Sequence, residues 1–381
     1  MDHVVSVACP ACGAAVHDSD RFCEGCGAAL VAPAAPAEPS PEPSPQPSPE
    51  PSAADGAGAP CRSCGGVVAA DGYCEQCGAL AVSERDHWSE RPAPHVGGVC
   101  DRGRRHARNE DAMALHADGA LTALVVCDGV SSAPDSDLAS LAAARAARDV
   151  LAAGAVPATV TEAARPAAWS ALLVDAAAAA DAAIRGAVGD RAGRAEPPSC
   201  TFVAAVVDGP LVVTGWLGDS RTYWLPDAGT PRQLSADDSG ANELIARGVP
   251  RAQAESSPTA HAITRWLGPD APDVVPQTTA TRTQGPGWVL VCSDGLWNYC
   301  SEAADLDALV RDVEARVGSA PDAIAAELVT WANAQGGHDN ITVALARPTG
   351  DSLQAEPTGS AANVEAAPPP ASRPDLDPTD R

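Results

Sequence analysis

The sequence contains no lysine. Its 25 basic residues are all arginine and stand against 50 acidic residues, which gives a formal net charge of −25. A protein that binds a nucleic acid backbone needs a basic surface, because much of the affinity comes from the counterions that basic side chains displace. The charge balance therefore argues against nucleic acid as the main partner, and it suits a protein that concentrates cations.

Long apolar runs are absent as well. The most alanine-rich segment, residues 167–188, is interrupted by Asp175, Asp181 and Arg185, whereas a membrane-spanning helix needs about 20 predominantly apolar residues. The chain starts Met1-Asp2-His3 and has no basic region followed by an apolar core, so the sequence predicts no secretory signal. We therefore expect a soluble cytoplasmic protein that does not bind a membrane.

Eight of the 13 cysteines form two matched quartets. In each quartet two Cys-x-x-Cys pairs are separated by nine or ten residues, and glycine follows the second cysteine of each pair, as in a zinc knuckle. Four thiolates complete the tetrahedral shell of Zn²⁺, so the pattern predicts two structural zinc ribbons. The alternative is a pair of redox-active dithiols. The predicted ligands are Cys9, Cys12, Cys23 and Cys26, then Cys61, Cys64, Cys74 and Cys77.

Proline content divides the chain. Residues 31–60 carry proline at nearly every second position over much of their length, which predicts a disordered extended linker, because proline fits neither a helix interior nor a sheet ladder. The polar, proline-rich tail is also expected to be disordered. The predicted order is a ribbon at 1–30, the linker at 31–60, a second ribbon at 61–80, a connector at 81–94, a large domain at 95–347 and the tail at 348–381.

The large domain does not alternate strictly between strands and helices. Short apolar runs predict buried strands at 121–127, 201–207, 211–217 and 288–292. Helical periodicity with alanine-rich interiors predicts helices at 138–151, 167–188, 306–317 and 322–334. This order fits two antiparallel sheets covered by helices better than one parallel sheet.

Acidic residues lie beside apolar runs in five motifs. Taken alone, each has an ordinary structural interpretation, because Asp-Gly is common in turns and Asp-Asn in helix caps or Asx-turns. Taken as an ordered set, they predict a site for hard divalent cations, which prefer oxygen ligands. The motifs are Gly103-x₅-Asn109-Glu110-Asp111, residues 125–129 ending in Asp128-Gly129, Gly218-Asp219-Ser220-Arg221, residues 291–297 containing Asp294-Gly295, and His338-Asp339-Asn340.

This ordered set resembles the metal-dependent protein phosphatase (PPM) family, also called protein phosphatase 2C, over about residues 95–347. The resemblance implies an α+β fold, a four-layer α-β-β-α sandwich, with two Mg²⁺ or Mn²⁺ ions and a third, weaker one in bacterial members. On the family's pattern the metal ligands are Asp128, which bridges two ions, the carbonyl of Gly129, Asp294, Asp339, Glu110 and Asp111 largely through water, and Asp219 at the third ion.

The sequence departs from the family at the phosphate clamp. Members usually carry arginine four residues before the glutamate of the first motif, and here that residue is His106. Either flanking residue, Arg105 or Arg108, could supply the guanidinium, while His106 itself could contact phosphate or donate a proton. Val130 also replaces a histidine that eukaryotic members often carry after the Asp-Gly pair. The alternative is that Arg105, His106 and Arg108 are surface charges on a loop.

The resemblance implies hydrolysis of phosphoserine and phosphothreonine in proteins by a metal-activated water, in opposition to a bacterial Ser/Thr kinase. Two alternatives remain: a pseudophosphatase that senses phosphopeptides and is recruited through its ribbons, and a phosphatase for regulators of anti-σ factors. The ribbons are expected to bind a protein, since they carry few arginines. Residues 234–267 resemble the flap region that borders the family's active site.

Overall fold

A computed structural model describes residues 6–8, 15–17, 60–61, 64–69, 73–78, 81, 83–119, 121–154, 156–157, 159–257 and 262–348. The chain divides into two units, residues 1–52 and 53–381. In the first unit the described residues form the hairpin β1 (Ser6–Ala8) and β2 (Ala15–His17). The cysteines of the first quartet, nearly all of the predicted linker and the tail from residue 349 lie outside the described residues.

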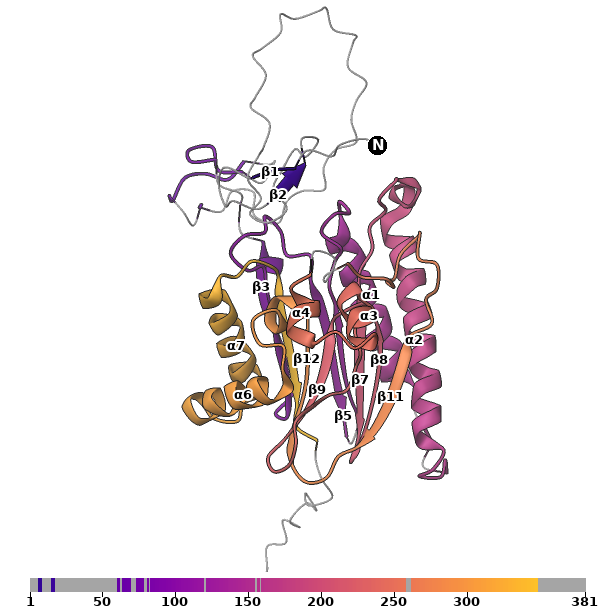
Figure 1. The fold of residues 1–381 in the computed structure, drawn as a ribbon. Helices are drawn as coiled ribbons and strands as arrows, with labels where there is room; N and C mark the ends of the chain where they lie inside the picture. The colour runs from indigo at the N-terminus through magenta and orange to yellow at the C-terminus, as the bar shows by residue number, and fades with distance from the viewer. Residues whose placement is uncertain are drawn as a thin grey trace, which may run out of the picture. The chain divides into compact units, whose positions relative to one another are not determined.

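Two antiparallel sheets form the centre of the second unit (Figure 1). The six-stranded sheet has the order β10-β9-β12-β13-β4-β3, and the five-stranded sheet has the order β11-β8-β7-β6-β5. The strands are β3 (His87–Ala93), β4 (Val96–Asp101), β5 (Ala112–Asp118), β6 (Leu121–Cys127), β7 (Phe202–Asp208), β8 (Leu211–Leu217), β9 (Arg221–Pro226), β10 (Arg232–Gln233), β11 (Gln277–Arg282), β12 (Gly287–Cys292) and β13 (Ile341–Ala346).

The inner strands are buried on both faces. Strand β6 illustrates this, because successive side chains of a strand point to opposite faces. Leu124 and Val126 pack in the core between the sheets, whereas Ala123 and Val125 pack against the helices outside. Such strands read as continuous apolar runs, which is why the sequence predicted four of them correctly.

Helices cover both outer faces of the paired sheets (Figure 1). The helices α1 (Ser136–Ala153) and α2 (Arg165–Val188) pack on the five-stranded sheet, while α6 (Ala303–Val317) and α7 (Pro321–Gln335) pack on the six-stranded sheet. The predicted α-β-β-α sandwich of the α+β class is confirmed. The remaining elements are α3 (Gly240–Ala246), α4 (Arg251–Glu255), α5 (Asp294–Trp297), and the 3₁₀ turns η1 (Glu84–Asp86) and η2 (Gly189–Gly193).

Among the described residues, one helical stretch, Arg165–Gly193, is long and apolar enough in composition to cross a membrane. In the structure the apolar face of α2 belongs to the core. Trp169, Leu173 and Ile184 are buried in the layer between α1, α2 and the five-stranded sheet. These residues belong to the buried face of the helix.

The first strand of the six-stranded sheet lies earlier in the chain than the sequence predicted. Strand β3 lies within residues 81–94, where the sequence predicts a connector, and it pairs with β4 as an edge strand. Its side chains are exposed or half-buried, and its central residues Ser89, Glu90 and Arg91 are polar. An edge strand of this kind lacks the apolar run by which buried strands are recognised.

Leu173 offers a test of the helical layer. It is fully buried in α2, and its side chain approaches the backbone of β8 at Gly215. We expect Leu173→Ala to lower the free energy of unfolding by about 2–5 kcal/mol, because the substitution leaves a cavity that the sheet cannot fill. Leu138→Ala is the matched control, since Leu138 in α1 is 37% exposed. Urea denaturation followed by circular dichroism checks both; equal losses would contradict the packing described here.

Candidate functional site

The acidic motifs meet at one end of the sandwich because they lie at strand ends. Asp111 directly precedes β5 and Asp128 directly follows β6, and these strands pair with Ala112 opposite Cys127. In the other sheet, Cys292 lies opposite Val343, so that Asp294 after β12 and Asp339 before β13 reach the same end. Asp219 follows β8. The structure thus brings the predicted carboxylates together from distant parts of the chain.

Two glycines of the motifs permit close approach of the backbone at this end. A Cβ atom on Gly129 would lie 2.7 Å from the carbonyl oxygen of Glu110, and one on Gly295 would collide with the carbonyl oxygen of Asn340. Any larger residue would push these segments apart. The Asp-Gly pairs are therefore contact points between segments.

The side chain of Asn340 joins the first and last motifs. It is buried, its Oδ1 accepts a hydrogen bond from the backbone N–H of Glu110 at 2.8 Å, and its Nδ2 donates to the carbonyls of Arg102 and Arg108 at 2.7 and 3.0 Å. The loop that carries Glu110 is thereby fixed beside Asp339. The sequence placed Asn340 in a motif but gave it no role.

Within this carboxylate cluster, two buried oxygens lack a hydrogen-bond partner among the described residues: Asp111 Oδ1 and Asp294 Oδ1. The second oxygen of Asp111 accepts hydrogen bonds of 2.7 Å from Ser293 Oγ and Thr342 Oγ1, and the second oxygen of Asp294 accepts one from Asn298 Nδ2 at 3.0 Å. A buried carboxylate oxygen without a partner is costly, and a cation at that position removes the cost.

The carboxylates also raise one another's pKa. Burial is the main cause for Asp128 and Asp294, whose pKa values lie well above the ordinary range, and the neighbouring negative charges add to it. Burial raises the pKa of Asp111 to about 6 and that of Asp219 to about 7. An all-oxygen set of this charge fits hard divalent ions such as Mg²⁺ or Mn²⁺, which would reverse these shifts.

His106 lies at the edge of this carboxylate cluster. Its Nε2 is 3.2 Å from Asp339 Oδ1 and its Nδ1 is 3.7 Å from Glu110 Oε2, and interaction with the Glu110 carboxylate raises the pKa of the imidazole. Of the other two clamp candidates, Arg105 is exposed, and Arg108 is exposed and lies 3.7 Å from Asp135. Among the three, His106 is the residue that the structure brings against the predicted metal ligands.

Arg221 stabilises the segment next to Asp219, a role that the sequence did not reveal. It is 1% exposed, binds Asp237 with Nη2 at 2.6 Å, and lies over the ring of Trp297 at 3.6 Å. The Nε1 of Trp297 donates to the carbonyl oxygen of Asp219 at 2.9 Å. The segment expected to form the flap is thus anchored, through Asp237, to Arg221 at the start of β9, two residues after Asp219.

Hydroxyl groups form the other supporting contacts that sequence reasoning missed. Ser136 Oγ donates to Glu110 Oε1 at 3.1 Å, and Ser140 Oγ donates to the carbonyl oxygen of Glu110 at 2.5 Å. Both serines lie in the first turns of α1, which therefore orients the acidic loop. Single serines in a helix give no motif, so the sequence held no signal for them.

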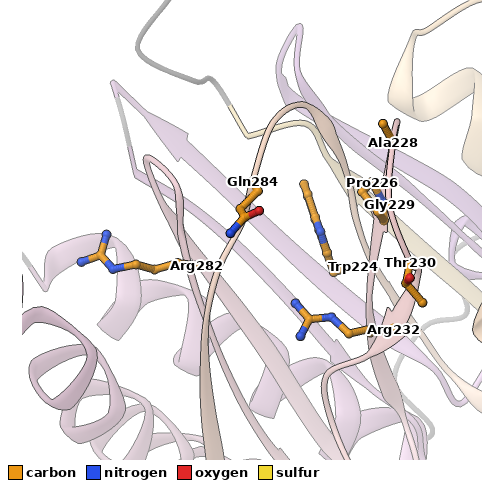
Figure 2. Close-up of a pocket in the computed structure, with 8 residues that line it drawn as sticks. All are labelled: Trp224, Pro226, Ala228, Gly229, Thr230, Arg232, Arg282 and Gln284. Carbon is orange, nitrogen blue, oxygen red and sulfur yellow. The ribbon is translucent and has the colours of Figure 1, made fainter.

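A cavity of about 450 Å³ lies away from these carboxylates. Strand β9 begins at Arg221, near Asp219, and ends at Pro226, which lines the cavity, so about 17 Å of strand separates the two. Figure 2 shows Trp224, Gln284 and Arg232 grouped around it, while the guanidinium of Arg282 extends away. The cavity is therefore distinct from the carboxylate cluster.

The second cysteine quartet converges as predicted. The Sγ atoms of Cys61, Cys64, Cys74 and Cys77 all lie within 4.8 Å of one another, with Sγ–Sγ distances of 3.7 Å between Cys61 and Cys77 and 3.5 Å between Cys64 and Cys74. A Zn–S length of about 2.3 Å in a tetrahedron requires sulfurs about 3.8 Å apart, so the cluster fits Zn²⁺. The backbone N–H of Gly66 donates to Cys64 Sγ, as in a knuckle.

Comparison with known proteins agrees with this geometry. The family model for protein phosphatase 2C matches residues 102–333, and the model for the double zinc ribbon matches residues 9–78. The serine/threonine phosphatase stp of Listeria welshimeri is 34% identical over 146 residues, which are 38% of this chain and 55% of that protein. The chain thus spans about half the length of the curated relatives that it matches.

Solved structures share the fold. The PPM Ser-Thr phosphatase MsPP from Mycobacterium smegmatis superposes with a TM-score of 0.51 at 27% identity, covering 66% of this chain and 97% of that chain. Serine/threonine phosphatase Stp1 from Staphylococcus aureus gives 0.56 at 23% identity, covering 68% and 96%. Because the phosphatase model matches more than half of the chain, and the fold and carboxylate cluster agree with it, the protein belongs to the protein phosphatase 2C family.

Proposed function

We propose that the protein hydrolyses phosphoserine and phosphothreonine in other proteins with the help of bound Mg²⁺ or Mn²⁺. The observation that carries this proposal is the buried carboxylate cluster with its two unpartnered oxygens on Asp111 and Asp294. When bound, the ions would act as Lewis acids at the phosphoryl group and lower the pKa of a water molecule. Family membership supports the same reaction.

The acidic residues of the cluster would have separate roles in metal binding. Asp128, whose negative charge interacts with those of Asp111 and Asp294, is suited to bridge two ions, with the Gly129 carbonyl beside it. Asp339 and Asp294 would complete one ion's shell, and Glu110 and Asp111 would act around the other, partly through water. Asp219 would serve a third ion. These assignments use each residue that the family pattern predicts.

His106 is the residue that we propose for binding the substrate phosphate. It lies against Glu110 and Asp339, and both carboxylates favour the protonated imidazole, which attracts an anion. Arg105 and Arg108, both exposed, would then assist from the rim of the site. A phosphate held here would be directed to the carboxylate cluster, and therefore to its ions.

The cellular setting is part of the proposal. The substrates would be phosphoproteins, including targets of a bacterial Ser/Thr kinase, in the cytoplasm, and the zinc ribbons would recruit a protein partner. A pseudophosphatase is the second candidate, since His106 replaces the usual arginine. The complete set of carboxylates favours catalysis, because a domain that only senses phosphate needs no crowding of negative charge.

Replacing one proposed ligand tests catalysis. We expect Asp294→Asn to lower kcat on a phosphothreonine peptide with Mn²⁺ by at least about 100-fold, because an amide binds hard ions much more weakly than a carboxylate does. A chelator should abolish the wild-type turnover. Asp175→Asn, a change of the same type on the exposed face of α2, should leave kcat unchanged.

The same variant has a second readout. In chelator, Asp294→Asn should unfold at a higher temperature than the wild type, since it removes a buried charge that repels its neighbours. Stoichiometric Mn²⁺ binding by the wild type without any turnover would overturn the proposed catalysis and favour the pseudophosphatase.

His106 is tested by varying the leaving group. We expect His106→Ala to lower kcat/KM about 10–100-fold on both a phosphothreonine peptide and an aryl phosphate, because a phosphate contact acts on every substrate. His106→Arg should restore most of the loss. Arg105→Ala is the comparison and should cost less than His106→Ala. A loss confined to the peptide, with its poor alkoxide leaving group, would instead identify His106 as the proton donor.

The ribbon is tested by metal analysis of the full chain. We expect Cys74→Ser to reduce bound zinc from about two ions to about one per chain, since one of four thiolates is lost, while kcat on an aryl phosphate stays unchanged. Cys300→Ser, a change at a cysteine outside both quartets, should retain all zinc. Absence of zinc together with reversible disulfide formation would favour the redox-active dithiols.

A further inference from the structure

A second cavity, of about 200 Å³, lies beside the carboxylate cluster. Its walls come from three segments, residues 130–133, 195–199 and 263–270. These segments are held in register: Gly129 forms a β-bridge with Cys200, and Cys200 forms another with Leu267. The first lining residue, Val130, directly follows Gly129, whose carbonyl oxygen we propose as a metal ligand. A peptide whose phosphoryl group reached the cluster would have a neighbouring side chain at this cavity.

The surface of this cavity combines apolar groups with two carboxylates. Val130, Ile263 and Trp266 contribute apolar surface, while Glu196 and Asp270 contribute negative charge. The Nε1 of Trp266 donates to Asp270 Oδ1 at 2.9 Å, which fixes the indole relative to that carboxylate. A long apolar stem that ends in a positive charge matches such a lining.

The two carboxylates are not neutralised by the protein itself. Within the described part of the chain, Glu196 forms neither a hydrogen bond nor an ion pair, and Asp270 forms none with a cation. The neighbouring arginines are engaged elsewhere: Arg194 binds Asp135 at 3.1 Å and Arg265 binds Asp273 at 2.6 Å. Arg185 and Arg191 likewise bind Asp181 and Asp135.

The indole of Trp266 adds a preference for a cation. Tryptophan is the aromatic side chain that attracts a guanidinium or ammonium group most strongly, and arginine makes such contacts more often than lysine. An acidic substrate side chain would meet Glu196 and Asp270 at close range and be repelled. A purely apolar side chain would contact Trp266 but gain nothing from the two carboxylates, which stay exposed to solvent. The lining thus favours a basic side chain over both alternatives.

We propose that this cavity binds an arginine or lysine side chain close to the phosphorylated residue of the substrate, so that the enzyme selects basic phosphopeptides. The inference rests on the proposed phosphatase function and adds a substrate class to it. The chain's net charge of −25 acts in the same direction, since it attracts basic segments at long range. Glu196, Asp270 and Trp266 are therefore assigned as specificity-determining residues.

The test compares phosphothreonine peptides of equal length on the full chain with Mn²⁺. They carry arginine, norleucine or glutamate at one position, scanned over about three positions on each side of the phosphothreonine. At the position that reaches the cavity, we expect arginine to give about tenfold higher kcat/KM than norleucine, and glutamate to give a lower value than norleucine. Norleucine separates the effect of the charge from that of the apolar stem.

Glu196 and Asp270 are both exposed, so they can be changed without disturbing the core. The double variant Glu196→Gln with Asp270→Asn should lose the preference for arginine and keep the wild-type kcat/KM on the norleucine peptide. Asparagine at 270 retains an oxygen that accepts the hydrogen bond from Trp266. Asp175→Asn is the matched control and should keep the preference. Equal rates on all peptides, or an unchanged preference in the double variant, would overturn the inference.

An aryl phosphate has no flanking side chain, so it tests catalysis alone. Hydrolysis of the aryl phosphate without any preference among the peptides would overturn only the cavity assignment. Failure to hydrolyse any substrate would instead contradict the phosphatase proposal. The cavity is then tested by fluorescence anisotropy with the same peptides: tighter binding of the arginine peptide, lost in the double variant, supports the assignment, and equal affinities overturn it.

Discussion

The burial of several carboxylates at one end of the sandwich, together with their mutual repulsion, is the constraint on which the site depends. An aspartate whose pKa rises on folding costs stability as the pH increases from its unfolded value towards its folded value, which for Asp111 means from 3.8 to about 6. At neutral pH the metal-free fold therefore carries this cost in full. Cations that bind only the folded chain offset it, so metal binding and stability are coupled.

Much of the surrounding structure holds those charges in place. Antiparallel pairing brings strand ends from residues 111 to 339 to one edge, and Asn340 fixes the first motif against the last. Behind them, the ion pair of Arg221 with Asp237 and its contact with Trp297 stiffen the segment next to Asp219. Rigid support is what a site of like charges requires, because each group would otherwise move away from the others.

The sequence predicted the parts of the fold that depend on runs of apolar residues and the parts of the site that depend on short acidic motifs. Buried strands such as β6 and β12 and the four long helices follow from apolar periodicity, and the aspartates were recognisable because each adjoins a strand. Edge strand β3 was missed because polar residues occupy its centre. Hydrogen bonds from Ser293 and Thr342 to Asp111 connect residues about 180 to 230 positions apart, and no local pattern encodes such distant pairs.

The close approaches at Gly129 and Gly295 limit how the protein can be engineered. Replacing glycine by alanine is a common way to stabilise a fold, because it restricts the unfolded chain. At these two positions a single methyl group would meet the backbone of Glu110 or Asn340 and separate the segments that carry the carboxylates. Thermostable versions of this protein would have to be sought in the helical layers, where a glycine such as Gly186 has open space around it.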